Sequence, residues 1–127
     1  MTLLDTSVVV AAFREPGPVR QQLRLAMIDG ERLALCALVV YEWRRGPRRA
    51  EELAAQEAVL PTADAWAFGS AEALLAAELY RRIARAGRRE VDLGIAASAL
   101  ARGANLWTLN PADFADIPGL ALYQPPS

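Results

Sequence analysis

Short apolar runs alternate with longer segments of helical periodicity along this chain. Four runs bounded by polar or turn-forming residues predict buried strands, at residues 3–4, 33–36, 106–109 and 120–123. Six segments with apolar positions at helical spacing predict helices, at residues 8–13, 19–28, 38–45, 48–57, 70–86 and 93–102. Because strands alternate with helices, the pattern predicts an α/β fold with a central, mostly parallel sheet of four to five strands flanked by helices.

Helix boundaries and domain organisation follow from the residues between these segments. Ser70 is expected to cap the long helix that follows it, and Gly87 to provide its left-handed exit. The chain has no internal repeat, low-complexity tract or interdomain linker, and its 127 residues suit one continuous core. We therefore expect a single domain over residues 1–127.

The amino-acid composition excludes several kinds of chemistry. The chain has no histidine and no lysine, so all 14 of its basic residues are arginine. The lack of histidine excludes a Ser-His triad, a histidine general base and histidine zinc ligands. The lack of lysine excludes a P-loop and Schiff-base chemistry. Cys36, the single cysteine, is predicted to be a buried thiol in a core strand.

The sequence carries no sign of a membrane or secreted protein. Asp5 interrupts the first apolar run and no basic residue precedes it, which differs from a signal peptide. No uncharged stretch approaches the roughly 20 apolar residues that cross a bilayer. The net charge of −1 attracts neither nucleic acid nor a membrane in bulk. We expect a cytoplasmic protein without a membrane partner.

Four acidic residues stand where predicted strands end or lie on the helices that follow them. Asp5 and Asp92 each precede a predicted helix, where N-capping is the ordinary explanation. Asp113 lies in a turn after the third predicted strand, where an Asx turn is equally ordinary. Glu42 shares the apolar face of its predicted helix, and an acid there is costly without a partner or a polar cavity. A pocket-facing Glu42 is therefore favoured over a solvated one.

Taken together, the four acids predict a metal site. In a parallel α/β sheet the carboxyl ends of the strands meet at one edge, which is where ligands bind. Clustered carboxylates raise one another's pKa unless a cation neutralises them. With oxygen ligands only, the expected ion is Mg²⁺ or Mn²⁺, and carboxylates that hold such an ion provide chemistry without histidine or lysine. The residues predicted to hold the ion and to carry catalysis are Asp5, Glu42, Asp92 and Asp113.

Four blocks of sequence occur in order along nearly the whole chain, at residues 4–7 (LDTS), 41–46 (YEWRRG), 92–100 (DLGIAASAL) and 108–114 (TLNPADF) with 117–120 (IPGL). Together they resemble the PIN domain family, and especially the VapC-type toxins of prokaryotic toxin–antitoxin modules. The resemblance implies a PIN-like sandwich and a Mg²⁺- or Mn²⁺-dependent endoribonuclease that cleaves RNA. It also implies a homodimer and neutralisation by a cognate VapB-type antitoxin.

The resemblance also assigns roles to single residues. The three central acids of the family correspond to Asp5, Glu42 and Asp92. Thr6 corresponds to the hydroxyl residue beside the first acid, which orients that acid or a metal-bound water. Many relatives have an aspartate where this chain has Asn110, and others have an acid three residues later, where this chain has Asp113. We assign Asp113 as the fourth acid and Asn110 as a neutral helper.

Arginine is expected to bind the RNA backbone. Two basic groups flank the predicted site, after residue 42 and before residue 92, and the favoured phosphate contacts are Arg44, Arg45 and Arg88. The alternative is that these arginines are solvated or paired with neighbouring glutamates. Trp43 and Trp66 are candidates for stacking on bases, although packing in the core or in a dimer is the favoured explanation.

Two rival functions stay open on the sequence. The first is a catalytically degenerate PIN-like module that binds RNA or protein, which Asn110 favours and the retained acids oppose. The second is a metal-dependent phosphatase or DNA nuclease with a similar acidic site. An antitoxin is expected to bind an apolar surface around residues 19–28 and 39–53.

Overall fold

A short parallel sheet forms the centre of the fold. The computed structural model describes residues 1–14 and 16–127. Strand β1 (Thr2–Leu4) lies between β2 (Leu33–Ala34) and β3 (Asn105–Trp107), and both pairings are parallel. Leu3 is in register with Ala34 on one side and with Leu106 on the other. All residues of β1 are buried, as expected for a central strand covered on both faces.

Fewer strands form than the four to five that the sequence predicts. In the described part of the chain, the segment at 120–123 reaches the sheet through an isolated parallel bridge between Leu122 and Leu106. A second isolated bridge joins Cys36 to Trp66 beyond the end of β2. Prolines flank residues 120–123 on both sides, and they have no N–H to extend a ladder. The predicted edge strand is therefore in the right place but much shorter than expected.

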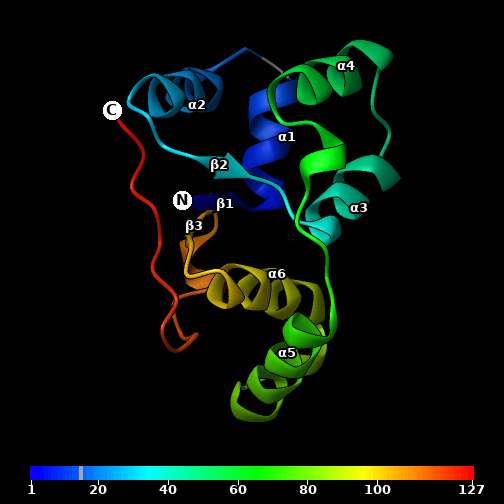
Figure 1. Ribbon diagram of the computed structural model, residues 1–127, viewed down its shortest axis with the longest axis vertical. Helices are drawn as coiled ribbons and strands as arrows, with labels where there is room; N and C mark the ends of the chain where they lie inside the picture. The colour runs from blue at the N-terminus through cyan, green and yellow to red at the C-terminus, as the bar shows by residue number, and fades with distance from the viewer. Residues whose placement is uncertain (15) are drawn as a thin grey trace.

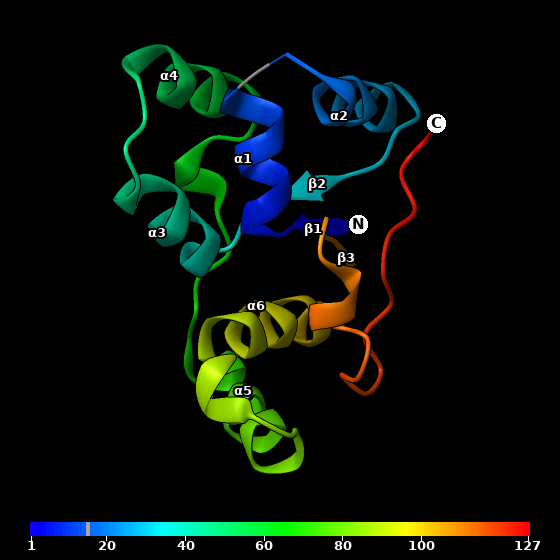
Figure 2. The ribbon, with the colours of Figure 1, turned by 180° about the vertical axis from the view of Figure 1, so that it is seen from behind.

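Helices cover both sides of the sheet, which confirms the predicted α/β class. On one side lie α1 (Thr6–Arg14), α2 (Pro18–Ile28) and α4 (Ala50–Val59), and on the other α5 (Ser70–Arg82) and α6 (Glu90–Ala101) (Figures 1 and 2). Helix α3 (Ala37–Arg45) lies beyond the carboxyl end of β1 (Figure 1). Three short 3-10 helices lie in the connections: η1 (Thr62–Asp64), η2 (Ala86–Arg88) and η3 (Pro111–Asp113).

The boundaries around α5 and α6 differ from the sequence prediction. Helix α5 starts at Ser70 with Gly69 at its N-cap, and it ends at Arg82. The left-handed residue after it is Arg85, with φ 57°, and not Gly87, which lies inside η2. Helix α6 begins at Glu90, so Asp92 lies within its first turn and is not the capping residue. A glycine signal marks where a left-handed residue is easy to place, but packing decides where it is needed.

Helix α6 is the most deeply buried helix of the fold. Residues 93–99 are all buried, so the helix is enclosed on every side and not only along one face. Its contact with α3 is close at Gly94, where a Cβ atom would lie 2.5 Å from Cδ1 of Leu38. Because Leu38 precedes Glu42 by one helical turn and Gly94 follows Asp92, this contact brings two predicted site acids to the same region. No helix within residues 1–14 and 16–127 is long and apolar enough to cross a membrane.

Candidate active site

Asp5 stands where β1 ends and α1 begins. Its backbone amide donates a hydrogen bond to the carbonyl of Trp107 in β3 (2.9 Å), and its own carbonyl accepts the amide of Val8 (3.0 Å). The side chain is 6% exposed. The position is that of an N-cap, as the sequence suggests, but the carboxylate accepts hydroxyl hydrogen bonds and not backbone N–H groups of α1.

Two hydroxyl groups hold the carboxylate of Asp5. Ser7 Oγ and Thr108 Oγ1 both donate to Asp5 Oδ2, at 2.9 and 2.7 Å. Each hydroxyl in turn accepts a backbone amide of the segment after β3, from Leu109 at 3.0 Å and from Asn110 at 3.0 Å. The arrangement fixes Oδ2 and leaves Oδ1 without a hydrogen-bond donor among the described residues. Neither Ser7 nor Thr108 was predicted from the sequence to support the site, although both lie inside the recognised blocks.

Glu42 faces the amino end of α1, which supports the expectation that it is not simply solvated. Its Oε1 accepts a hydrogen bond from Thr6 Oγ1 (2.6 Å), and its Oε2 lies 3.6 Å from Nη2 of Arg45. Thr6 therefore contacts Glu42 and not Asp5, and the neighbouring Ser7 donates the hydrogen bond to Asp5. The hydrogen bond ties α1 to α3 and fixes the direction of the half-buried glutamate.

Asp92 is the acid whose charge is most strongly opposed by its surroundings. The pKa of its carboxyl is raised from 3.8 to about 6, first by burial and then by the negative charge of three other acids. Those acids are Asp5, Asp113 and Glu42, in decreasing order of effect. A helix N-terminus favours an anion by only about 0.3–1 kcal/mol. Burial and repulsion outweigh that contribution in the first turn of α6. The positive charge of Arg89 lowers the pKa of Asp92 but offsets only part of the rise.

Asp113 and Asn110 lie at the exposed end of the site. Both belong to the segment of η3, and neither side chain has a hydrogen-bond partner among the described residues. The backbone carbonyl of Asp113 accepts a hydrogen bond from Nη2 of Arg89 (2.7 Å), and the same guanidinium binds the carboxylate of Asp116. Asp113 acts on the pKa of Asp92, so it lies within electrostatic reach of the other acids. Arg89, which the sequence did not predict as a site residue, therefore contacts the segment of the fourth acid.

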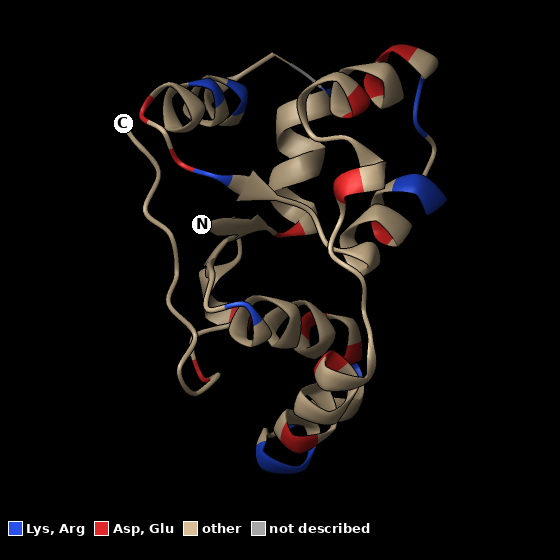
Figure 3. Ribbon diagram, viewed as in Figure 1, with Lys and Arg blue, Asp and Glu red and all other residues tan. Residues whose placement is uncertain are grey.

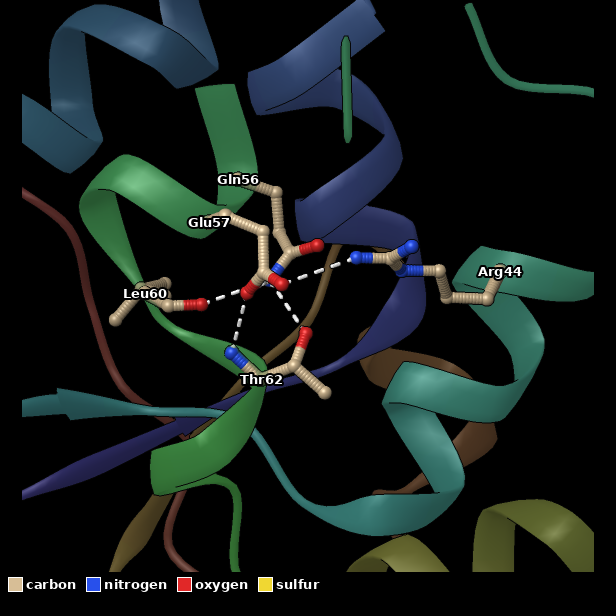
Figure 4. A network of polar contacts seen from close by, with 5 residues as sticks. All are labelled: Arg44, Gln56, Glu57, Leu60 and Thr62. Carbon is tan, nitrogen blue, oxygen red and sulfur yellow. Dashed lines mark hydrogen bonds and ion pairs between the residues drawn. The ribbon is translucent and has the colours of Figure 1, made fainter. Parts of the chain in front are cut away.

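The arginines proposed to bind phosphate differ in their surroundings. Charged residues lie on helices on both sides of the sheet, with arginines at the ends of α3 and α5 (Figure 3). Arg44 donates to Glu57 of α4 (3.2 Å) and is part of a polar network that also includes Gln56, Leu60 and Thr62 (Figure 4). That pairing matches the alternative explanation for Arg44.

The surroundings of the other two arginines differ from those of Arg44, although Arg45 also pairs with a neighbouring glutamate, Glu42. Arg45 lies beside Glu42, and Arg88 is exposed in η2 before α6. Trp43 is 1% exposed and belongs to the core, so it cannot stack on a base, while the ring of Trp66 is covered by the guanidinium of Arg102 (4.7 Å). Packing, and not base stacking, explains both tryptophans.

The donor set suits a hard divalent cation. The four acids come from four different elements and supply only carboxylate oxygens, which are ligands that Mg²⁺ and Mn²⁺ prefer. In the described residues, no three Asp, Glu or Cys side chains already converge at coordination distance. The charges of Asp5, Glu42 and Asp113 nevertheless reach Asp92 and raise its pKa, so these carboxylates repel that of Asp92. A cation between them would remove that repulsion, which makes the cluster a fitting site for one.

The fold and the site together define an α/β domain with an acidic site at the carboxyl edge of a parallel sheet. The family model described as PIN domain matches residues 2–120 of the chain. The chain therefore belongs to the PIN domain family. None of the curated proteins compared with it matches closely enough to count as a relative.

Solved structures with the same fold include several VapBC complexes. A chain in the structure of VapBC2 from Rickettsia felis bound to a promoter DNA fragment is 24% identical, with 96% of each chain covered and a TM-score of 0.75. A chain of DNA-bound VapBC from Salmonella typhimurium is 22% identical over 96% of each chain, with a TM-score of 0.72. VapBC-5 from Mycobacterium tuberculosis, a toxin–antitoxin system, is 28% identical over 94% of this chain and 92% of its own, with a TM-score of 0.63. The fold is that of VapC-type PIN domains.

Proposed function

We propose that this chain is a Mg²⁺- or Mn²⁺-dependent endoribonuclease of the VapC type. The observation that carries the proposal is a group of four acids at the carboxyl edge of the sheet. The charges of three of them raise the pKa of the fourth, Asp92. The rigid support of Asp5 by two hydroxyls adds to it, because a ligand held in one orientation needs little rearrangement to bind an ion.

The proposed ligands are Asp5, Glu42, Asp92 and Asp113, directly or through water. When bound, Mg²⁺ or Mn²⁺ would supply Lewis acidity, which favours ionisation of water and stabilises charge on the phosphoryl oxygens. Hydrolysis forms a bond from a water oxygen to phosphorus, breaks the bond to the leaving oxygen and returns a proton to that oxygen. The protein itself has to place the ligands, accept a proton and hold the RNA backbone.

Asp113 is the acid best placed to accept the proton of the attacking water. Its carboxylate is exposed and accepts no hydrogen bond from the described residues. The carboxylate of Glu42, by contrast, receives the Thr6 hydroxyl on one oxygen and faces Arg45 on the other. We therefore propose Glu42 as an oriented ligand and Asp113 as the proton acceptor. Arg45 and Arg88 are proposed to contact phosphates of the RNA.

An antitoxin of the VapB type is the proposed protein partner. A groove of about 510 Å³ between α1, α2 and α4 is lined mainly by apolar residues, including Phe13, Leu23, Met27 and Ile28. Ile28 is 71% exposed and its neighbour Met27 is 45% exposed, so contiguous apolar side chains of this groove face solvent. This surface includes part of the expected segment 19–28 but uses the end of α4 in place of residues 39–53. A homodimer is proposed as well, since Leu74 on α5 is 74% exposed.

Metal removal is the direct test of the proposed activity. We expect the purified protein to cut total RNA into discrete fragments with Mg²⁺ or Mn²⁺, and EDTA to stop the cleavage. Single-stranded DNA and a chromogenic phosphoester should stay intact under the same conditions. The measurement is gel analysis with end-mapping of the fragments.

Other outcomes of that test point to the rival functions. Cleavage of DNA or of the phosphoester would favour a DNA nuclease or a phosphatase. A folded protein that is inert with both ions would contradict the proposal and favour the degenerate binding module. Cleavage that persists in EDTA would rule out metal dependence.

Loss of the Thr108 hydroxyl tests the support of Asp5. We expect Thr108→Val to lower cleavage by about 10- to 100-fold, the usual effect of removing a group that orients a metal ligand. Thr108→Ser keeps the hydroxyl that donates to Asp5 Oδ2 and should retain most of the activity. Initial rates and Mn²⁺ titrations of both variants provide the measurement. Equal activity of Thr108→Val and the wild type would show that this hydroxyl has no such role.

A further inference from the structure

Arg89 joins two segments that carry predicted site acids. Its backbone stands at the N-cap of α6, three residues before Asp92, where its carbonyl accepts the Leu93 amide (2.8 Å). Its guanidinium reaches the segment after β3. Nη1 and Nη2 donate to the two carboxylate oxygens of Asp116, at 2.8 and 2.7 Å, and Nη2 also donates to the backbone carbonyl of Asp113 (2.7 Å). One side chain therefore links the start of α6 to the segment of the fourth acid.

The geometry of this link is directional. A guanidinium that donates two parallel hydrogen bonds to one carboxylate fixes both position and angle, which a single point charge does not. The Arg89 side chain is 18% exposed and that of Asp116 is 51% exposed. Partly exposed ion pairs contribute little to the global free energy of unfolding. The effect of the pair should therefore be local, on the segment that it holds.

The segment needs such a restraint because its acid is repelled by the rest of the site. Asp113 and Asp92 both carry carboxylates, and like charges in one site repel each other. Phe114 and Ile117 are buried and anchor the segment in the core, but the turn of η3 before them is exposed. Without a polar link, repulsion would favour conformations in which this turn moves away from α6.

We propose that Arg89, paired with Asp116, is a positioning residue that holds Asp113 within reach of Asp92. The inference rests on the proposed metal-dependent function and adds the part of the chain that keeps the fourth acid in place. Arg89 acts through the backbone carbonyl of Asp113 and the carboxylate of Asp116. It is therefore distinct from Arg45 and Arg88, which are proposed to contact RNA.

Charge and position predict opposite effects on metal affinity. If Arg89 acted only as a positive charge near the acids, its removal would strengthen binding of a divalent cation. If it positions Asp113, its removal weakens binding, because one ligand is no longer held near the others. The sign of the change in Mn²⁺ affinity on Arg89→Gln therefore separates the two roles.

The experiment compares Arg89→Gln, Arg89→Lys and Asp116→Asn with the wild-type chain. Calorimetry with Mn²⁺ measures affinity, RNA cleavage gives kcat and KM, and amide hydrogen exchange reports on residues 110–117. For Arg89→Gln we expect a Mn²⁺ Kd about tenfold higher, a kcat about 10- to 100-fold lower, an unchanged KM and faster exchange in this segment. Asp116→Asn should change in the same direction, and Arg89→Lys should recover only part of the loss. Arg32→Gln, an exposed arginine before β2, is the matched control.

Two results would overturn the inference. A Mn²⁺ affinity that is equal or higher in Arg89→Gln, in a protein whose wild type binds Mn²⁺ and cleaves RNA, would leave Arg89 as a charge or a surface pair only. Exchange in residues 110–117 that does not change in either Arg89→Gln or Asp116→Asn would show that the pair does not hold the segment. A wild-type chain that neither binds Mn²⁺ nor cuts RNA would instead overturn the proposed function, and the inference with it.

Discussion

Replacing Asp5 with asparagine is expected to lower RNA cleavage by more than about 100-fold while the fold is retained. Groups that only orient metal ligands already cost about 10- to 100-fold when removed, so the loss of a ligand charge should cost more. Asparagine has the same shape, and its side-chain oxygen can still accept the hydroxyls of Ser7 and Thr108. Initial rates with saturating Mn²⁺, together with thermal unfolding, provide the measurement.

A matched variant separates the role of Asp5 from a general effect of lost charge. Asp64 is exposed on η1 and its carboxylate has no hydrogen bond among the described residues, so Asp64→Asn should cleave RNA at the wild-type rate. If Asp5→Asn and the wild type cut equally, Asp5 would not be a ligand, and the activity would have to come from another site or from a contaminating nuclease. An inactive Asp5→Asn that is also unfolded would instead assign Asp5 a structural role.

Replacing Asp92 with asparagine is expected to make the metal-free protein more stable at pH 7 and also inactive. The pKa of this carboxyl is about 6 in the folded chain and 3.8 without its surroundings, a difference that corresponds to about 3 kcal/mol at roughly 1.4 kcal/mol per pH unit. Because Asp92 is only half-buried, we expect a gain of about 1–3 kcal/mol. Chemical denaturation in EDTA measures this gain, and RNA cleavage with Mn²⁺ measures the loss of activity.

The stability difference between the wild type and Asp92→Asn should also depend on pH in a defined direction. Below pH 3.8 the carboxyl of Asp92 is protonated in both the folded and the unfolded wild type, so no free energy of unfolding is lost to ionisation of this group. As the pH rises towards 6, the unfolded chain loses this proton first, and the wild type becomes less stable relative to Asp92→Asn. The difference between the two proteins should therefore grow from about pH 4 to 6 and stay constant above it. A difference that is independent of pH would contradict the raised pKa.

In the proposed function, Asp92 would be a metal ligand that lowers the stability of the metal-free chain. The burial and repulsion that disfavour its charge are the properties that make a divalent cation favourable at the same place. A bound cation would lower the pKa of this carboxyl. Because the carboxyl of the metal-free protein takes up a proton below about pH 6, we expect the affinity for Mn²⁺ to fall as the pH falls below that value. Stability lost in the metal-free chain is thus recovered on binding.

The class of fold could be predicted from the amino-acid sequence alone, and the composition limited the reactive groups that a site could use. Alternating apolar runs and helical segments are local patterns, and they predicted a parallel α/β protein correctly. The absence of histidine and lysine restricted the reactive groups to carboxylates, hydroxyls, amides, tyrosines and arginines. The recognised blocks then predicted Asp5, Glu42 and Asp92 as site residues, and the charges of Asp5 and Glu42 are among the causes that raise the pKa of Asp92.

The polar groups that contact Asp5 and the segment of Asp113 are known only from the tertiary structure. Thr108 binds the carboxylate of Asp5 from 103 positions away, and Arg89 reaches Asp116 from 27 positions away. No local spacing encodes such contacts, because they depend on the pairing of β1 with β3 and on the packing of α6. The left-handed conformation at Arg85 and the three-stranded sheet also differ from what the sequence pattern predicts. Periodicity along the chain is a property of single elements, whereas a site is built from several.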